Sequence, residues 1–375
     1  MSALFSNVSQ LNWQQVVMWC IGGLLIYLAI RKDMEPTLLL PLGFGAILVN
    51  LPMSGAVTQV YDGIAEIGVI DVLFDAGIAN ELFPLLLFVG IGAMIDFEPL
   101  LTNPKLMIFG AAAQFGIFFT LSLAALFGFD LKDAASIAII GAADGPTSIF
   151  VANYFHSKYI GAIMVAAYSY MALVPVVQPP VIKLLTTKQE RRIRMVYQQR
   201  SVSKITKILF PIAITVITGI VSPRSVALIG FLMFGNLIRE CGVLDSLSET
   251  AQKVLANLVT LFLGITIATK MQAQYFLTAE TLLILGLGLV AFVFDTAGGV
   301  IFAKILNLFL PKDSKINPMI GAAGISAFPM SARVVHKLGR AEDPQNFLLM
   351  PAVGVNVSGQ IASVIAGGLI LNLLG

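Results

Sequence analysis

Long runs of apolar residues alternate with short polar stretches along almost the whole chain. Most runs are nearly free of charge and are about twenty residues long, the length of an α-helix that crosses the hydrocarbon core of a bilayer. The pattern predicts ten spans, at residues 12–31, 37–52, 81–97, 105–128, 158–182, 208–222, 225–240, 255–271, 280–309 and 346–373. The expected fold class is therefore an all-α polytopic membrane protein.

Two further segments, 133–155 and 315–336, interrupt this pattern because they are rich in glycine, proline and polar residues. Glycine and proline break helices, and irregular backbone is tolerated at membrane depth only where protein buries it or where it lines a water-filled cavity. Each segment occupies the same place in its half of the chain. We therefore expect both to form broken or re-entrant hairpins, although ordinary loops are an alternative.

The two halves of the chain look like copies of each other. Three pairs of short segments occur in the same order in both halves: 36–44 and 223–231, 87–91 and 261–265, and 141–143 and 321–323. This order predicts an internal repeat of five spans. Residues 1–182 would form the first membrane repeat, residues 183–207 a connecting loop and residues 208–375 the second membrane repeat.

Charge predicts the orientation of the two repeats. The loop 183–207 contains eight Lys or Arg residues and one acid, Glu190, which is typical of a cytoplasmic loop. Five spans precede the loop, so the N-terminus would lie outside, and Arg31 and Lys32 would end the first span on the cytoplasmic side. The second repeat would then have inverted topology. The first hairpin would enter from outside and the second from the cytoplasm.

Composition narrows the function classes. Hydrophobic residues make up 57% of the 375 positions and charged residues 12%, about half the share in a soluble protein. Two cysteines and two histidines offer no disulfide framework, zinc spacing or haem pair. The sequence lacks a P-loop motif, and Thr269-Lys270-Met271 is a poor biotin acceptor, so we expect neither ATP chemistry nor a covalent cofactor on this chain. A net charge of +2 gives no reason to expect nucleic acid.

The segment between the second and third spans, 53–80, is unusually acidic from Tyr61 onward. Asp62, Glu66, Asp71, Asp75 and the following Glu81 lie among apolar residues there. This mixture favours an amphipathic segment at the membrane interface.

The first Gly/Pro-rich segment contains the strongest candidate site. Asp144 is a carboxylate at membrane depth, which is costly unless it is paired or binds an ion. Gly145 and Pro146 break the helix beside it and free backbone carbonyls, and further oxygens come from Thr147, Ser148 and Asn153. Oxygen ligands suit a hard cation, so we expect Na⁺ here and no transition metal. The alternative is an ordinary helix N-cap, for which Asp followed by Pro is also well suited.

The second segment offers a different set of groups. Gly324 stands where the first copy has Asp144, so the negative charge is not duplicated. Ser326, Ser331 and Arg333 could instead bind an anionic carboxylate, with the guanidinium of Arg333 forming the charged contact. Alternatively, Arg333 extends to the membrane interface.

The remaining polar positions lie in or near the late spans of each repeat. Asn356, Ser358, Gly359, Gln360 and Ser363 have spacings that share a helix face, either beside the Asp144 site or as bridges between helices. Tyr170 precedes a proline-rich stretch and is either an interfacial residue or a proton donor. Asp295 interrupts the span 280–309 and is a secondary candidate.

Three motifs resemble the beta subunit of sodium-pumping biotin-dependent decarboxylases, the family of oxaloacetate, methylmalonyl-CoA and glutaconyl-CoA decarboxylases. They are Gly141-Ala-Ala-Asp-Gly-Pro-Thr147, Tyr168-Ser-Tyr-Met-Ala-Leu-Val-Pro175 with Gln178-Pro-Pro180, and Leu87-Phe-Val-Gly-Ile-Gly-Ala-Met94. The resemblance covers nearly the whole chain. It implies that this subunit decarboxylates carboxybiotin, consumes a proton and exports Na⁺.

The resemblance also implies partners and residue roles. A soluble carboxyltransferase would load biotin on a separate carrier protein, and a small gamma-type membrane subunit would complete an oligomeric complex in the bacterial inner membrane. The essential aspartate of the family matches Asp144, its proton-donating tyrosine Tyr170 and its polar last-span asparagine Asn356, with Ser358, Gly359 and Ser363 after it. The short chain favours an acyl-CoA type. A sodium-coupled carboxylate symporter or cation/proton exchanger, and a purely structural anchor, are the alternatives.

Overall fold

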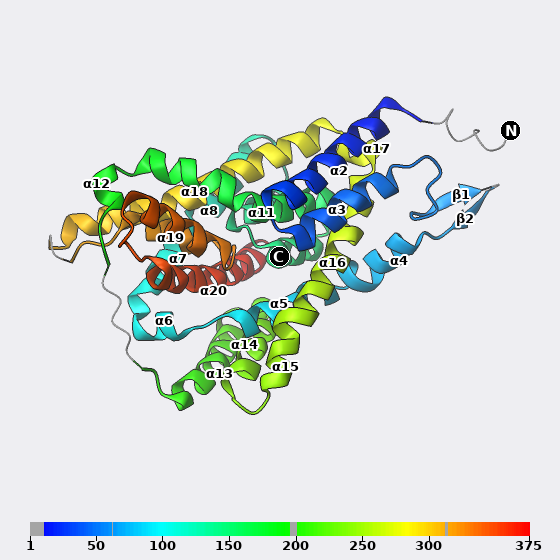
Figure 1. The fold of residues 1–375 in the computed structure, drawn as a ribbon. Coiled ribbons are helices and arrows are strands. Elements are labelled where there is room, and N and C mark those ends of the chain that lie inside the picture. Colours follow the sequence, from blue (N-terminus) through cyan, green and yellow to red (C-terminus); the bar gives the residue numbers. More distant parts are fainter. Residues whose placement is uncertain (1–10, 62, 196–200, 312–313) are drawn as a thin grey trace.

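The computed structural model describes residues 11–61, 63–195, 201–311 and 314–375 as a helical bundle (Figure 1). Helices α12 and α19 lie at one end of the bundle, and the strands β1 and β2 and helix α17 lie at the opposite end (Figure 1). The only strands in the described ranges form the short hairpin β1–β2. The predicted all-α class is confirmed, and the chain is a multi-pass membrane protein.

The first half of the chain contains short and long helices in alternation. Its elements are α2 (Trp13–Lys32), α3 (Pro36–Val49), β1 (Gln59–Tyr61), β2 (Ile64–Glu66), α4 (Val69–Phe74), a π-helical turn (Asp75–Ala79), α5 (Leu82–Met94), α6 (Glu98–Thr102), a 3₁₀ turn (Pro104–Leu106), α7 (Met107–Ala113), α8 (Phe115–Leu126), α9 (Leu131–Ala138), a 3₁₀ turn (Ile139–Ala142), α10 (Gly145–Tyr154) and α11 (Ile160–Leu185).

The second half follows a similar order. Its elements are α12 (Lys188–Arg191), α13 (Lys204–Val221), a 3₁₀ turn (Pro223–Ser225), α14 (Val226–Glu240), α15 (Asp245–Glu249), a π-helical turn (Thr250–Leu255), α16 (Ala256–Ile267), a 3₁₀ turn (Ala268–Met271), α17 (Ala273–Phe276), α18 (Ala279–Phe309), a 3₁₀ turn (Pro318–Gly324), α19 (Met330–Glu342) and α20 (Leu349–Leu374).

Fewer helices are long enough to cross a membrane than the hydrophobic runs predict. Seven helices in the described part of the chain have the length and apolar composition of a span, and α4 with α5 makes an eighth if this pair, bent by 61°, is one span. Helix α3 is apolar but has only 14 residues, which is about 21 Å and shorter than the hydrocarbon core. Helix α14 has 15 residues. Ten separate full-length spans are therefore not confirmed.

The acidic segment 53–80 does not form one continuous amphipathic element. It folds into the β1–β2 hairpin, which projects from the bundle, followed by α4 and the π-helical turn (Figure 1). Asp62, part of the predicted acidic segment, and Arg200, part of the predicted basic loop, lie outside the described residues.

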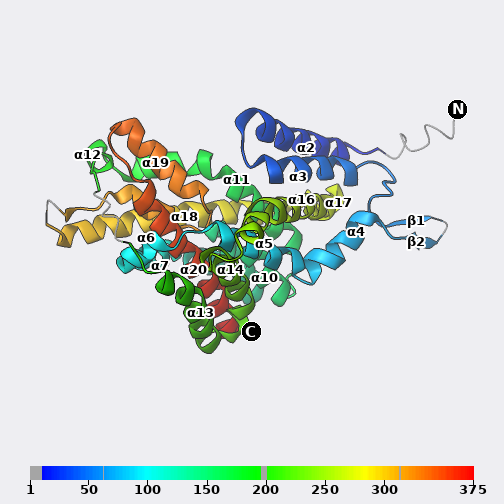
Figure 2. The same cartoon turned by 60° about the horizontal axis from the view of Figure 1, so that its bottom comes forward.

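Two helix pairs flank a central core. The pair α2–α3 and helix α13 lie on opposite sides of α18 (Figure 2). Helix α3 packs on α16, and α14 packs on α5. Both contacts are close because glycine lies at each of them: Gly45 lies against the backbone of Ile265, and Gly235 against the backbone of Val89.

Both Gly/Pro-rich segments are buried in this core. The first consists of α9, its 3₁₀ turn and α10, and we call residues 131–154 the first hairpin. The second consists of the turn Pro318–Gly324 and α19, and we call residues 318–342 the second hairpin. Both pack against α18 and α20. The predicted interruptions of the helical pattern are therefore present in both halves.

Candidate functional site

The break in the first hairpin follows directly from its sequence. The 3₁₀ turn ends at Ala143, whose φ of 51° is left-handed, and Asp144 is extended. Helix α10 then starts at Gly145 with Pro146 in its first turn, where proline lacks only an amide that would have no helical partner. The break therefore presents the Asp144 side chain at a helix N-terminus inside the protein.

The Asp144 carboxylate has only uncharged partners. Its Oδ1 caps α10 by accepting from the Thr147 amide at 3.3 Å. Its Oδ2 accepts from Thr147 Oγ1 at 2.8 Å, from Ser363 Oγ at 2.9 Å and from Gln360 Nε2 at 3.2 Å. The side chain is buried, and no Lys or Arg in the described part of the chain forms an ion pair with it. We call these four residues the Asp144 cluster.

This geometry combines the two alternatives for Asp144. The N-cap is present, but it uses only Oδ1, whereas Oδ2 collects hydroxyl and amide groups from α10 and from α20. Hydroxyls can donate or accept, so the same groups could turn their lone pairs towards a cation. A buried carboxylate without a charged partner is costly, which a bound monovalent cation would relieve.

Of the two other predicted ligands in the first hairpin, one lies near Asp144 and the other does not. Ser148 stays close to Asp144, because its Oγ donates to the Asp144 carbonyl at 2.8 Å. Asn153 lies two turns further along α10. Its Nδ2 donates to Ala79 O and to Glu81 Oε1, both at 3.0 Å, so the structure does not bring Asn153 to the Asp144 cluster.

The predicted residues of the last span divide between two places. Asn356 is directed at the second hairpin, where its Nδ2 donates to Ala323 O at 3.0 Å and to Ile325 O at 2.7 Å. Ser358 donates to Leu106 O at 3.0 Å. The structure therefore brings neither residue to Asp144. One helical turn further on, Gln360 and Ser363 do reach it.

The two hairpins touch each other at their breaks. The amide of Ser326 donates to Ala142 O at 2.9 Å, and Ser326 Oγ donates to Gly359 O at 3.0 Å. Ser331 Oγ exchanges hydrogen bonds with Gln178 of α11, and Gln178 also donates to Ala322 O. These serines therefore hold the second hairpin against α20, α11 and the first hairpin.

Arg333 lies apart from this buried network. It is exposed on α19. Its charge acts on Glu35, which precedes α3: burial raises the pKa of Glu35, and the Arg333 guanidinium opposes that rise. Of the three residues predicted to bind an anion, Arg333 is therefore exposed, whereas Ser326 and Ser331 are buried.

Two tyrosines of α11 occupy separate positions near the first hairpin. The Tyr170 hydroxyl donates to the carbonyl of Leu285 on α18, and its ring packs with Ile140 in one buried cluster. Tyr168 is fully buried, its ring lies against Gly145, and its hydroxyl has no partner among the described groups. The ring of Tyr168 thus covers the start of α10, beside the Asp144 cluster.

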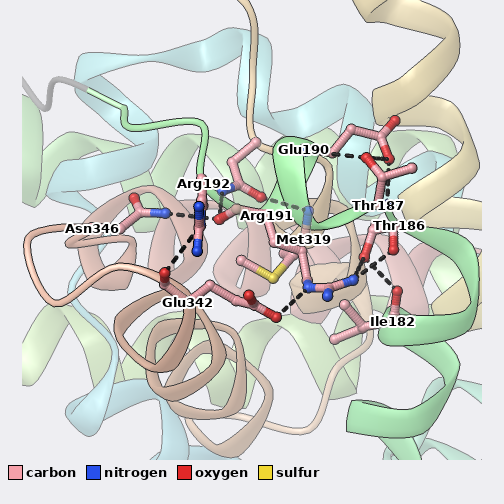
Figure 3. Close-up of polar contacts among 10 residues, drawn as sticks. Ile182, Thr186, Thr187, Glu190, Arg191, Arg192, Met319, Glu342 and Asn346 are labelled. Atoms are coloured by element: carbon pink, nitrogen blue, oxygen red, sulfur yellow. Dashed lines mark hydrogen bonds and ion pairs between the residues drawn. The ribbon is translucent and has the colours of Figure 1, made fainter.

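The basic loop between the halves is fastened to the second hairpin. Arg191 is buried, and its Nε donates to Glu342 Oε1 at 2.7 Å while its Nη1 donates to Thr186 O at 2.6 Å (Figure 3). The Arg191 carbonyl accepts from Asn317 at 3.0 Å and from Asn346 at 2.9 Å. These contacts join α12 to both ends of the second hairpin, and we call them the Arg191 cluster.

A buried carboxylate surrounded by neutral oxygen groups at a helix break is typical of multi-pass membrane proteins that bind a small cation. A family model described as "Na⁺-transporting oxaloacetate decarboxylase beta subunit" matches residues 14–374. The chain belongs to this family.

Three relatives align with almost the whole of this chain and over almost their own full length. The glutaconyl-CoA decarboxylase subunit beta of Acidaminococcus fermentans is 48% identical over 97% of this chain and 94% of its own length. The methylmalonyl-CoA decarboxylase subunit beta of Propionigenium modestum is 46% identical over 97% of this chain and 96% of its own length. The probable oxaloacetate decarboxylase beta chain of Vibrio cholerae is 43% identical over 96% of this chain and 95% of its own length.

Proposed function

We propose that this chain is the membrane subunit of a sodium-translocating decarboxylase. It decarboxylates carboxybiotin presented by a separate carrier and couples this reaction to Na⁺ export and proton consumption. The observation that carries the proposal is the Asp144 cluster, because it offers one negative charge and several neutral oxygens at membrane depth. Membership of the family supports the same activity.

The Na⁺ site would consist of Asp144, Thr147, Gln360 and Ser363, with Ser148 beside it. The three hydroxyl or amide side chains that now donate to Asp144 would turn their oxygens towards the ion. Asn356 and Ser358 would act indirectly by holding α20 against the second hairpin and against Leu106. Asn153 and Glu81 would form a separate polar pair at the far end of α10.

Carboxybiotin would approach from the end of the bundle that carries the basic loop. Arg333 is exposed there and could attract the carboxylate. Ser326 and Ser331 would stabilise the hairpin below it. Tyr170 would supply a proton by releasing the Leu285 carbonyl and donating to the reacting group.

An inverted repeat of ten membrane-inserted helical segments accounts for the packing. The contact α3–α16 has its counterpart in α14–α5, and α11–α18 has its counterpart in α20–α7. Even single side chains correspond: Asn50 donates from the end of α3 to Met271 O, and Asn236 donates from α14 to Ile95 O. The short helices α3 and α14 would then be equivalent, and the bilayer would be locally thinned around both.

The basic end of the bundle would face the cytoplasm. Ion pairs gather there, between Arg191 and Glu342, Arg194 and Asp343, Lys207 and Glu98, and Lys304 and Glu190. A soluble carboxyltransferase and a biotin carrier protein would dock on this side. A small gamma-type membrane subunit and further copies of the complex would contact the apolar flanks within the bacterial inner membrane.

The test is carboxybiotin decarboxylation by the purified subunit. Free carboxybiotin should release CO₂ at a rate that depends on sodium, and a biotinylated protein should co-purify with the chain. Moving Na⁺ outward against ~100 mV costs about 2.3 kcal/mol, so CO₂ release should slow as that gradient builds in sealed vesicles. A secondary transporter would move Na⁺ without releasing CO₂, and that result would refute the proposal.

A further inference from the structure

One face of α18 connects the two hairpins and Tyr170. The Leu285 carbonyl accepts from the Tyr170 hydroxyl, and Gly288 lies against Ile140 and the Tyr170 ring. Two turns further along, Asp295 lies against Gly141 of the first hairpin, and Gly299 then lies against Gly321 of the second. The positions 288, 295 and 299 are seven and four residues apart, two turns and one turn of helix, and so share one face.

Asp295 is the only charged side chain on this face, and only half of its carboxylate has a partner. Its Oδ1 accepts from the amide of Ile117 at 3.1 Å, so it caps the N-terminus of α8 from a different helix. Its Oδ2 is buried and has no partner among the described groups. Methyl groups built on Gly116 and Gly141 would meet Oδ1 at 2.6 Å and Oδ2 at 2.5 Å, so both backbones approach the carboxylate closely.

The unpartnered oxygen requires neutralisation. Asp295 is fully buried, and no ion pair in the described part of the chain includes it. An isolated buried carboxylate is costly and binds a proton or a cation instead. The Gly141 backbone approaches Oδ2 closely, and the Ala291 side chain lies beside the same glycine. A proton on Oδ2 neutralises the carboxylate without any further ligand and leaves Oδ1 free for the Ile117 amide.

We propose that Asp295 is a proton-binding site linked to cation binding at Asp144, so that Na⁺ binding at Asp144 releases a proton from Asp295. This inference rests on the Na⁺ site proposed above. Asp295 faces Gly141, and Asp144 is three residues further along the same break, at most about 11 Å away along the chain from Gly141. Two negative charges beside one break repel in a medium of low dielectric constant, so neutralising Asp144 lowers the proton affinity of Asp295.

The linkage is reciprocal. Titratable side chains on the elements packed against α18 are Lys132, Asp133, Asp144 and Tyr154 of the first hairpin and Tyr168, Tyr170 and Lys183 of α11. Asp144 is the buried carboxylate among them. An ionised Asp295 would repel an empty, negatively charged Asp144 and so favour Na⁺ binding there, whereas a protonated Asp295 would not. Each site therefore responds to the state of the other. Na⁺ binding would therefore be accompanied by proton release, and Na⁺ release by proton binding.

The experiment is a sodium titration of the purified full-length complex in weakly buffered solution, with a pH-sensitive dye recording proton release. Wild type should release protons as Na⁺ binds. Asp295→Asn keeps an oxygen for the Ile117 amide, so it should still bind Na⁺ but lose at least half of the proton release. Asp130→Asn is the matched control, because exposed Asp130 also caps a helix, α9, and its substitution should change nothing.

The outcomes separate the two proposals. Equal proton release by wild type and Asp295→Asn, or none by wild type, would refute the role of Asp295 alone. Unchanged Na⁺ binding by Asp144→Asn would instead refute the sodium site. If Asp295→Asn fails to fold, infrared difference spectra of wild type decide the matter: Na⁺ should remove the carbonyl band of a protonated carboxyl group, and an unchanged band contradicts the inference.

Discussion

The two oxygens of Asp144 have different partners. Oδ1 completes the N-terminus of α10, which any Asp or Asn could do. Oδ2 receives groups from α20 that lie more than 200 residues away in sequence. A residue that only capped a helix would not need this second set of partners. The functional hypothesis for Asp144 therefore depends on Oδ2 and on Gln360 and Ser363.

Tyr170 offers a test of the chemistry. Tyr170→Phe removes the hydroxyl that donates to Leu285 O and keeps the ring, so the folded protein should lose only about 1 kcal/mol of stability. If the phenol supplies the proton, carboxybiotin decarboxylation should fall by a factor of about 10² to 10⁴. The measurement is CO₂ release by the purified variant.

The control for Tyr170 is another tyrosine next to the same helix. Tyr159 precedes α11 and packs edge-on against Phe129, so Tyr159→Phe should decarboxylate at the wild-type rate. Wild-type turnover by Tyr170→Phe in an intact complex would show that the residue only packs between α11 and α18.

Local sequence was sufficient to predict part of the site. Gly145 and Pro146 next to Asp144 indicate a helix break wherever they occur, and Thr147 lies one turn into the helix that follows. Asn153 is near Asp144 in sequence, but α10 carries it away from Asp144 to Glu81. Gln360 was visible as part of a polar face. Which turn of that face meets Asp144 depends on the packing of α20, which no local pattern contains.

The hairpins are the elements that connect the sites. The break of the first hairpin meets the break of the second through Ser326 and Ala142, and α18 runs past both. The Arg191 cluster then attaches the second hairpin to the basic loop. Asn317 stands at one end of the hairpin, and Glu342 stands at the other (Figure 3). The loop is thus a structural part of the hairpin, whereas charge alone predicts only its side of the membrane.

Removing Arg191 should loosen the second hairpin. Arg191→Ala removes two charge-assisted hydrogen bonds from a buried group, so the free energy of unfolding should fall by about 2–4 kcal/mol. Arg194 is the matched control because it is exposed and pairs with neighbouring Asp343, and Arg194→Ala should change stability by less than about 1 kcal/mol. Thermal unfolding in detergent measures both.

The Arg191–Glu342 contact should also depend on pH. The hydrogen bond from Arg191, with its charge, lowers the pKa of Glu342 below the ordinary 4.5. A carboxyl group whose pKa falls on folding stabilises the protein above its unfolded pKa and loses that contribution as the pH drops through the folded pKa. The stability difference between wild type and Arg191→Ala should therefore be constant near neutral pH and shrink below about 4.5. An equal difference at every pH would contradict the ion pair.

The bundle as a whole has two chemically different ends. The basic loop and the ion pairs Arg191–Glu342 and Arg194–Asp343 lie at the end with α12 and α19, whereas the β1–β2 hairpin lies at the other (Figure 1). The helical class and the interruptions of the apolar pattern could be predicted from the sequence, because each has a local signature. Ten full-length spans are not confirmed, because α3 and α14 have only 14 and 15 residues.

Cysteine labelling tests the orientation. After Cys20 and Cys241 are replaced, Arg192→Cys should react with impermeant thiol reagents only from the cytoplasm, and Ala65→Cys in the β1–β2 hairpin only from outside. Intact cells and inverted vesicles give the two measurements. Labelling of the cysteine at position 192 in intact cells would contradict the proposed topology and the inversion of the repeats.

The measurement that decides the role of Asp144 is decarboxylation against sodium concentration in proteoliposomes, for wild type and Asp144→Asn. Asparagine retains the helix cap and nearly the same size but removes the charge. The wild-type rate should rise with sodium and saturate. Asp144→Asn should assemble normally, require on the order of a hundredfold more sodium and transport none in a coupled manner. Superimposable curves for the two proteins would contradict the sodium site.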